Sequence, residues 1–406
     1  MQPPPENPRA SESIDMLAPQ VRANPFPTYE SLRQHPPRPV EPAGVWAVAR
    51  YRDVQYVLKN SHLFISSAFQ RMLEPDWIPR NPMADSLLAL DPPEHTKLRA
   101  LANRGFTTAA IASLRPRIDA LAEELVEGLV QRADEVDFVA AMGAVMPARI
   151  IAELIGIDQG QHQSIKRWSN ALASITPAPP TEEQLRTVVP CIEEMSAHLG
   201  EVIQARRQKP QDDMVSRLVQ SEIDGRQLTD RELLGLLFIL VPAGFETTSH
   251  LLSSAALRFS QHPDELALLR AKPDRVPAYV EELLRYQPSV HGVLRLSTAD
   301  VELGGVTIPG GSMVLALLGA ANRDPDRFPD PDVFDINRNP TAHMSLGHGI
   351  HFCLGAPLAR MEAASAIAAM SRKLARVELA RDTALAWNRS LTIRGLMRLP
   401  LRCTAT

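Results

Sequence analysis

The chain has 406 residues, of which 45% are hydrophobic and 22% are charged, as expected for a globular protein with a large buried core. Its formal net charge of −4 gives no support for a nucleic acid or an anionic membrane as a partner. Three widely spaced cysteines without a CxxC pair argue against a disulfide framework, and the proline-rich, polar N-terminus lacks the apolar core of a secretory signal, so we expect a cytoplasmic protein.

The first part of the chain alternates between short regular elements and an irregular stretch. A strand is predicted at 44–49 and a helix at 53–59. Residues 62–91 scatter three prolines among bulky apolar residues and have no regular period. A long irregular segment inside a compact protein usually has a function, and we interpret this one as a lid over a pocket.

Helical periodicity dominates residues 93–260, for example at 118–130 and 147–155, with a proline-rich break at 176–180. The most apolar run, 233–245, is shorter than the roughly 18 residues that cross a bilayer.

The sequence pattern changes after residue 290. A hairpin is predicted at 301–308, with Gly304 and Gly305 in its turn, and a further strand at 312–318. Helical periodicity returns after Gly355, and the last 20 residues are predicted to be extended. Because the strands are scattered along a helical chain without repeats, we predict one domain over residues 1–406, mainly α with small β sheets.

Residues 345–355 contain several glycines around Cys353, which predicts a tight loop. A helix is predicted to start directly afterwards, at Ala356 and Pro357, so the thiol would lie at a helix N-terminus, where the thiolate is favoured and suited to bind a metal. Two alternatives are open: a small buried hydrophobic residue, or a zinc site formed with His343, His348 and His351. Zinc sites usually space their ligands differently from this His-x-Cys pair.

A long helix is predicted from 229 to 260, opened by a capping box of Thr229 and Glu232. Pro242 and Gly244 predict a kink with space beside it. We expect the Thr247 hydroxyl to bond back to the Ala243 carbonyl, with Glu246 beside it in contact with water. The alternative is an ordinary kinked core helix.

Two pairs of polar residues with helical spacing and one further arginine are also candidates for a site. Glu282 and Arg285 are three apart on a predicted helix, and an aromatic, proline-rich stretch ends at Arg338. His95 and Arg99 are four apart on another helix. Taken one at a time, such residues are usually ordinary surface residues.

In this order, these segments resemble the cytochrome P-450 family. The loop at 345–355 is similar to its heme-binding pattern Phe-Gly-x-Gly-x-His/Arg-x-Cys-x-Gly, with Leu346 in place of the phenylalanine. Residues 243–248 match its Ala-Gly-x-Asp/Glu-Thr-Thr pattern, and Glu282 and Arg285 match its ExxR helix. The resemblance covers essentially the whole chain and implies the mostly helical P-450 fold, with heme b between the long helix and the cysteine loop.

The resemblance also implies residue roles. Cys353 would be the axial ligand of the heme iron, and Glu246 and Thr247 would be catalytic, delivering protons to dioxygen. A structural triad of Glu282, Arg285 and Arg338 would hold the cysteine loop. The heme propionates would be bound by His95, Arg99, Arg295 and His351. The substrate pocket would be lined by the lid and by Leu240, Val241, Ala243, Gly244, Val290, Val293, Leu294, Thr392 and Ile393.

The implied activity is that of a monooxygenase, which inserts one oxygen atom from O2 into an apolar small molecule by hydroxylation or epoxidation. A role in polyketide, macrolide or terpenoid tailoring follows by analogy. Electrons would come from NAD(P)H through a ferredoxin reductase and a ferredoxin, and the protein would be a monomer. The expected ferredoxin surface comprises Lys97, Arg99, Arg104, Arg360, Arg372 and Lys373.

Two alternative activities are that of a peroxide-driven or non-oxygenating heme-thiolate enzyme and that of a heme-binding sensor. Glu246 and Thr247 argue against both, since neither activity needs an acid–alcohol pair on the long helix.

Overall fold

The computed structural model describes residues 13–406 except 133, 158–161, 176–178, 339–341 and 382. Most of the predicted break at 176–180 therefore lies outside the described residues. The helices are α1 Pro19–Ala23, α2 Phe26–Gln34, α3 Tyr51–Lys59, α4 Phe69–Leu73, α5 Glu94–Gly105, α6 Thr108–Ala112, α7 Arg115–Val130, α8 Val145–Leu154, α9 His162–Ala173, α10 Glu182–Gln208, α11 Met214–Val219, α12 Asp230–Gln261, α13 Pro263–Ala271, α14 Val276–Tyr286, α15 Leu318–Ala321 and α16 Ala356–Lys373.

The strands are short and come from distant parts of the chain. They are β1 Arg38–Val40, β2 Val45–Val48, β3 Phe64–Ile65, β4 Val136–Asp137, β5 Glu222–Ile223, β6 Arg226–Gln227, β7 Val293–Ser297, β8 Val301–Leu303, β9 Val306–Ile308, β10 Met313–Ala316, β11 Leu374–Leu379 and β12 Pro400–Ala405. Short 3-10 turns lie at Pro82–Asp85, Pro273–Arg275 and Gly349–His351, and a π-helical turn at Val139–Gly143.

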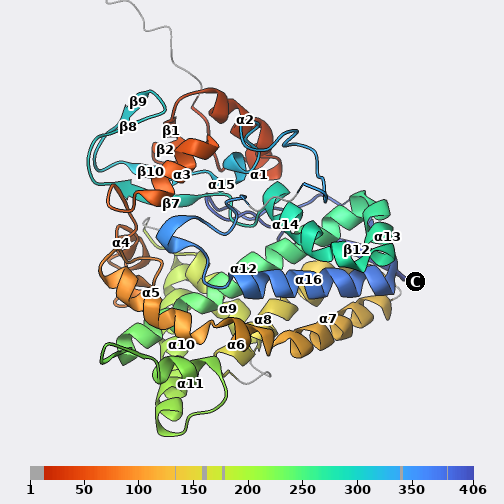
Figure 1. Cartoon of the computed structure of the whole chain (residues 1–406), viewed down its shortest axis with the longest axis horizontal. Coiled ribbons are helices and arrows are strands. Elements are labelled where there is room, and N and C mark those ends of the chain that lie inside the picture. The colour runs from red at the N-terminus through yellow and green to blue at the C-terminus, as the bar shows by residue number, and fades with distance from the viewer. Residues whose placement is uncertain (1–12, 133, 158–161, 176–178, 339–341, 382) are drawn as a thin grey trace, which may run out of the picture.

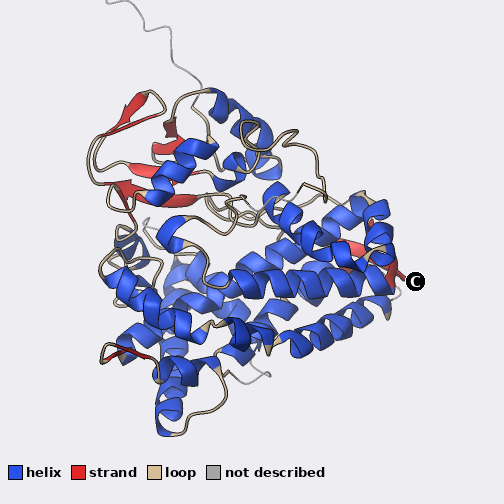
Figure 2. Ribbon diagram, in the orientation of Figure 1, coloured by secondary structure: helices blue, strands red, loops and turns tan. Residues whose placement is uncertain are grey.

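The largest sheet lies beside a helix-rich body, as Figure 2 shows. Its strand order is β1-β2-β10-β7-β3, with β2 and β10 parallel and the other neighbours antiparallel. A second sheet, β11-β12-β4, packs with the helices at the C-terminal end of α16. The prediction of a mainly α chain with small β sheets is confirmed.

Helix α12 runs through the helical body, with α16 beside it (Figure 1) and α8, α9 and α10 also packed on it. The predicted capping box is present, because the Thr229 hydroxyl accepts a bond from the Glu232 backbone N–H and the Glu232 carboxylate accepts one from the Thr229 backbone N–H. Contrary to the sequence estimate, α12 is long and apolar enough to span a membrane, the one described helix that is. Yet 56% of its most apolar window is buried inside the protein, as in a core helix.

Two local predictions are confirmed, and the strand predicted at 312–318 needs a correction. The strand at 44–49 is β2, and the hairpin at 301–308 is formed by β8 and β9, with Gly304 and Gly305 at positive φ. The strand predicted at 312–318 ends at Ala316, because Leu318–Ala321 turns into α15 and packs against α2 and α3.

The predicted lid at 62–91 is more regular than expected, since it contains β3, α4 and a 3-10 turn. Asp85 of that turn accepts two bonds from Arg231 at the start of α12, at 2.7 and 2.8 Å, and also pairs with Arg80. Burial raises the pKa of Asp85, but the Arg231 bond and the Arg80 charge outweigh it and lower that pKa overall. The Arg231–Asp85 pair fastens this segment to α12, and the Arg80–Asp85 pair lies within the segment.

Candidate functional site

Cys353 lies in the loop between the Gly349–His351 turn and α16. Its backbone N–H donates to the Leu346 carbonyl at 2.8 Å, which closes the loop on itself. Gly347 and Gly349 have φ values of +77° and +70°, a region that disfavours side chains. A Cβ at Gly349 would also lie 2.6 Å from the Leu58 carbonyl oxygen of α3. The glycines therefore allow a tight loop, as predicted, and allow its backbone to pack closely against α3.

The surroundings of the Cys353 thiol do not agree with the expectation that the helix N-terminus favours the thiolate. Burial raises the pKa of Cys353, and the Gly355 N–H and the charges of Arg99 and Arg360 lower it only in part. The helix N-terminus alone therefore does not favour the thiolate, because the cost of burying an anion is larger. A metal cation bound to the sulfur would supply that compensation, since a metal deprotonates a coordinating thiol outright.

One side of α12 presents the residues expected to be catalytic. The Thr247 hydroxyl donates to the Ala243 carbonyl at 2.7 Å, the contact predicted from the sequence. Ala243 is exposed, and Glu246 and Thr247 are partly exposed, so this side of the helix faces open space. Ser289 donates its hydroxyl to the Thr247 carbonyl at 2.7 Å and ties the helix to the segment before β7.

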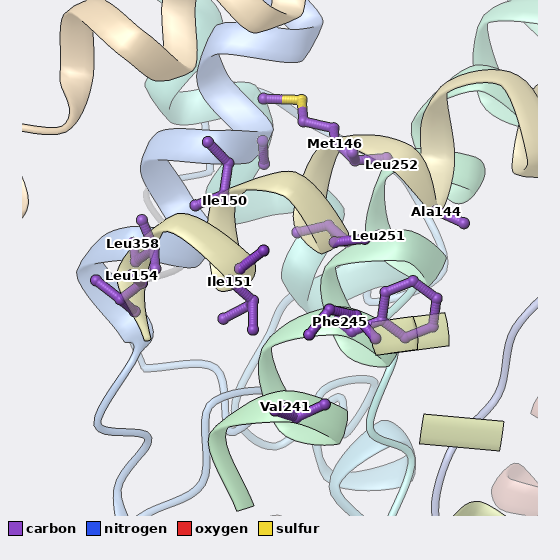
Figure 3. Packing of buried hydrophobic residues seen from close by; sticks show 14 of the residues in the cluster. Ala144, Met146, Ile150, Ile151, Leu154, Val241, Phe245, Leu251, Leu252 and Leu358 are labelled. Carbon is purple, nitrogen blue, oxygen red and sulfur yellow. The ribbon is translucent and has the colours of Figure 1, made fainter. Parts of the chain in front are cut away.

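The opposite side of α12 is core, as Figure 3 shows. Val241 is 0% exposed and shares this side with Phe245. A Cβ at Gly244 would lie 2.3 Å from the Ile151 side chain of α8, so the space expected beside this glycine is already filled. Val241 is therefore a core residue, and Gly244 faces Ile151 of α8, although Gly244 itself stays partly exposed.

Leu294 also proves to be a core residue, 7% exposed in the cluster under the large sheet. The other six pocket candidates stay partly or fully exposed, and Val290 forms an antiparallel bridge with Ile393 that joins two of their segments. These six are Leu240, Ala243, Val290, Val293, Thr392 and Ile393.

The four residues expected to bind propionates gather near the cysteine loop. The rings of His95 and His351 lie 4.3 Å apart. Burial, followed by the charges of Arg295, His95 and Arg99, lowers the pKa of His351 to about 3. Burial also lowers the pKa of Arg295 to about 10. Neither ring nitrogen of His95 has a hydrogen-bond partner among the described residues.

Only one carboxylate, Asp91, is among the charges that act on this cluster, and it already accepts bonds from the Ser66 and Ser67 backbone. The buried guanidinium of Arg295 and the partly exposed one of Arg99, beside the unpartnered His95 imidazole, leave the cluster short of negative charge. An anionic group such as a carboxylate would satisfy it.

Glu282, Arg285 and Arg338 form the predicted triad. Glu282 and Arg285 are fully buried and paired through two bonds of 2.7 and 2.8 Å, and Arg338 Nε lies 3.3 Å from Glu282. Arg285 also donates to the Asn322 carbonyl at 2.9 Å. The pair is thus part of the core, and the surface alternative is wrong.

A chain of hydrogen bonds connects the triad with the cysteine loop. Asn322 donates its amide to the Ser345 hydroxyl at 2.7 Å and accepts from the Met344 N–H at 2.7 Å. Ser345 in turn donates to the Leu284 carbonyl at 2.6 Å. Sequence reasoning missed Asn322 and Ser345, because neither contact follows from spacing along one helix.

The zinc alternative is not supported. The described residues contain no group of three or more His, Cys, Asp or Glu side chains that could hold a metal ion. His343 instead lies 3.2 Å from Glu281, which also pairs with Arg360 of α16. Burial raises the pKa of Glu281, but bonds from His343 and Arg360 outweigh it and lower that pKa to about 2.

The cytochrome P450 family model matches residues 42–381, which include every segment of the site described above except residues 392–395. The chain belongs to the cytochrome P450 family. One P450 relative, cytochrome P450 107B1 of Saccharopolyspora erythraea, is 36% identical over 391 residues, covering 92% of this chain and 94% of the relative. The mycinamicin IV hydroxylase/epoxidase of Micromonospora griseorubida is 37% identical over 367 residues, covering 90% and 91%.

The fold agrees with solved P450 structures. That of CYP109Q5 from Chondromyces apiculatus superimposes with a TM-score of 0.89 at 36% identity, covering 97% of this chain and 99% of the other. This P450 is therefore a monooxygenase that uses heme b and receives electrons from NAD(P)H through separate redox partners. The residues present fit the heme, because the partly buried Cys353 thiol and the cationic cluster that is short of negative charge suit an iron centre and its carboxylates.

Glu362 of α16 is a buried acid that the sequence did not reveal. It is 1% exposed, and its Oε2 has no hydrogen-bond partner among the described residues. Burial raises the pKa of Glu362 from 4.5 to about 8. Between these values the unfolded chain releases a proton that the folded protein retains, so stability falls as the pH rises through this range.

The Glu362→Gln variant is expected to lose this pH dependence. Its free energy of unfolding should fall less between pH 4.5 and pH 8 than that of the unmodified protein, because glutamine does not ionise. Urea unfolding at a series of pH values measures the slope. Glu201→Gln on the exposed side of α10 is the control and should leave the slope unchanged; equal slopes for all three proteins would contradict the prediction.

Leu346 is partly buried against the main core and accepts the Cys353 N–H through its carbonyl. We expect Leu346→Phe to change the heme reduction potential while the thiolate spectrum persists, because the side chain alters the apolar surroundings of the sulfur. Redox titration measures this potential. If neither the potential nor the autoxidation rate changes, position 346 contributes only to packing.

Proposed function

We propose that Cys353 is the axial thiolate ligand of the heme and that Glu246 and Thr247 form its proton-delivery pair. The bound heme supplies the reductive activation of dioxygen. The observation that carries the proposal is the Thr247 bond to Ala243, which keeps its hydroxyl on the open side of α12 beside Glu246. Thr247 holds a proton at Oγ1, and Glu246 resupplies it.

The cationic cluster would bind the propionates. Arg99 and Arg295 offer guanidinium groups whose paired N–H donors match a carboxylate, and His95 offers ring nitrogens that have no partner within the part of the chain that the structure describes. His351 is already oriented by Ser66, whose hydroxyl lies 3.1 Å from Nε2. The triad acts structurally, through Asn322 and Ser345, to hold the cysteine loop in register.

The substrate would be an apolar molecule of moderate size, held by the lid and the six partly exposed residues of the pocket. All of these six except Thr392 are hydrophobic, and none is charged, so binding would depend on apolar contact and not on an ion pair. The similarity to a mycinamicin hydroxylase/epoxidase supports a macrolide or polyketide as substrate.

A ferredoxin and its reductase would supply the electrons, with the protein acting as a cytoplasmic monomer. The expected docking surface is smaller than the sequence predicted. Arg372 and Lys373 pair with Glu123 and lie about 25 Å along α16 from its start near Cys353. Arg360 pairs with Glu281. Lys97 pairs with Glu94 on α5, and Arg99 is assigned to the propionates. The remaining surface comprises Arg104 on α5 and the exposed Phe352 beside Cys353.

The proton-delivery roles are tested with Glu246→Gln and Thr247→Ala. Turnover with a ferredoxin system and NAD(P)H should give product at a rate reduced by roughly 10²-fold, the lower end of what general acid catalysis contributes. Oxygen consumption should continue, with hydrogen peroxide in place of product.

The control for this pair is Ser253→Ala, two turns further along α12, whose hydroxyl bonds only to the Ser249 carbonyl. Unchanged coupling in both variants would reject the assignment. Full product formation from hydrogen peroxide alone would favour the peroxide-driven alternative.

A further inference from the structure

His250 is a buried histidine that the proton-delivery pair does not explain. It lies one turn after Glu246 on α12, with Nε2 3.6 Å from Glu246 Oε1. Its side chain is 9% exposed and that of Glu246 is 22% exposed. Neither ring nitrogen has a hydrogen-bond partner among the described residues. A buried imidazole without any partner is costly, so its nearest polar group is important.

The position of this imidazole is imposed by a second part of the chain. A Cβ at Gly395 would lie 1.8 Å from Nδ1 and 2.0 Å from Cγ of His250, so the backbone of the C-terminal turn is packed directly against the ring. Asn388 fixes that turn, because its N–H donates to the Gly395 carbonyl and its side chain accepts from the Gly395 N–H, both at 3.0 Å. The ring therefore has little freedom to move away from Glu246.

The carboxylate has more freedom than the ring. A small rotation of the partly exposed Glu246 side chain would shorten the 3.6 Å separation to a hydrogen bond, and such contacts often tighten only when an enzyme has bound its substrate. Glu246 is followed by Thr247, so a bond from His250 selects the carboxylate orientation at the start of the proposed relay.

We propose that His250 is a positioning residue that donates its Nε2–H to Glu246 and holds this acid ready to resupply Thr247. The proposal rests on the proposed function of Glu246. Coupled turnover converts O2, two electrons, two protons and the substrate R–H into R–OH and water. Without timely proton delivery, the same two electrons and two protons leave with O2 as hydrogen peroxide.

Two amide variants differ only in reach and provide the test. In His250→Gln the amide nitrogen extends to about the position of Nε2, whereas in His250→Asn it extends only to about that of Nδ1 and stops short of Glu246. We expect His250→Asn to lower the share of electrons found in product by several-fold and to raise peroxide correspondingly. His250→Gln should retain most of the coupling, and Ser253→Ala should retain all of it.

A spectroscopic measurement makes the test independent of turnover. The infrared C–O stretch of the ferrous carbon-monoxide complex reports the electric field on the α12 side of the heme. It should shift in His250→Asn and stay close to its original frequency in His250→Gln and Ser253→Ala. Equal behaviour of the two amide variants in both measurements, or an unchanged His250→Asn protein, would overturn the proposal.

The Glu246→Gln variant separates the two hypotheses. If Glu246→Gln leaves coupling unchanged, the proposed role of Glu246 fails, and that of His250 fails with it. If Glu246→Gln uncouples the enzyme but His250→Asn does not, only the inference about His250 fails. Adding His250→Asn to Glu246→Gln should cause no further loss of coupling, because His250 acts through the Glu246 carboxylate.

Discussion

Replacing Cys353 with serine is expected to abolish monooxygenase turnover and to remove the ferrous carbon-monoxide band from which the P450 family takes its name. Cys353 is the one cysteine in the loop at 345–355, and a serine hydroxyl at this partly buried position cannot provide the anionic sulfur that the band requires. Difference spectra of the reduced protein under carbon monoxide, together with product assays, measure both effects.

Cys403→Ser in β12 is the matched control, because this thiol is also partly buried and burial raises its pKa to about 11. It should keep the band and the activity. A Cys353→Ser protein that still shows the band would reject the assignment of the heme ligand.

The Glu282→Gln variant is expected to show the largest loss of stability. It leaves the buried Arg285 and the half-buried Arg338 without their carboxylate, and breaking a buried ion pair on one side costs about 3–5 kcal/mol. Heme content should fall as well, because Arg285 also holds Asn322, which in turn bonds to the cysteine loop. Urea unfolding gives the free energy, and the ratio of Soret to protein absorbance gives the heme content.

The control is Glu378→Gln in β11, where Glu378 pairs with Arg376 on the surface. An exposed pair of this kind contributes at most about 1 kcal/mol. If Glu282→Gln and Glu378→Gln unfold with similar free energies, the triad does not have the structural role proposed for it.

The sequence predicted the site where spacing along one element determines the geometry. Glu282 and Arg285 share a helix face by their three-residue separation, and the Thr247 hydroxyl reaches the Ala243 carbonyl because a helix brings residues four apart together. The cysteine loop was predictable because its glycines leave few conformations for the backbone.

Which face of a buried helix contacts which neighbour was not predictable in the same way. Helix α12 is apolar on nearly all sides, so its sequence does not tell which side contacts α8 and which side is open. Val241 and Gly244 were predicted to line the pocket for this reason. The burial of Val241 in the core and the contact of Gly244 with Ile151 depend on how two helices pack. The contact between His250 and Gly395, 145 positions away in the chain, is hidden from the sequence for the same reason.

The hydrogen-bonded chain from Arg285 through Asn322 to Ser345 has a consequence for how the cofactor is acquired. All of its members are protein groups, so the loop around Cys353 becomes ordered when the polypeptide folds. The conformational entropy of that loop is therefore lost before the porphyrin arrives and does not weaken its binding. The heme is thus expected to bind a preorganised site without further ordering of this loop, and its affinity should depend on apolar contacts and on charge.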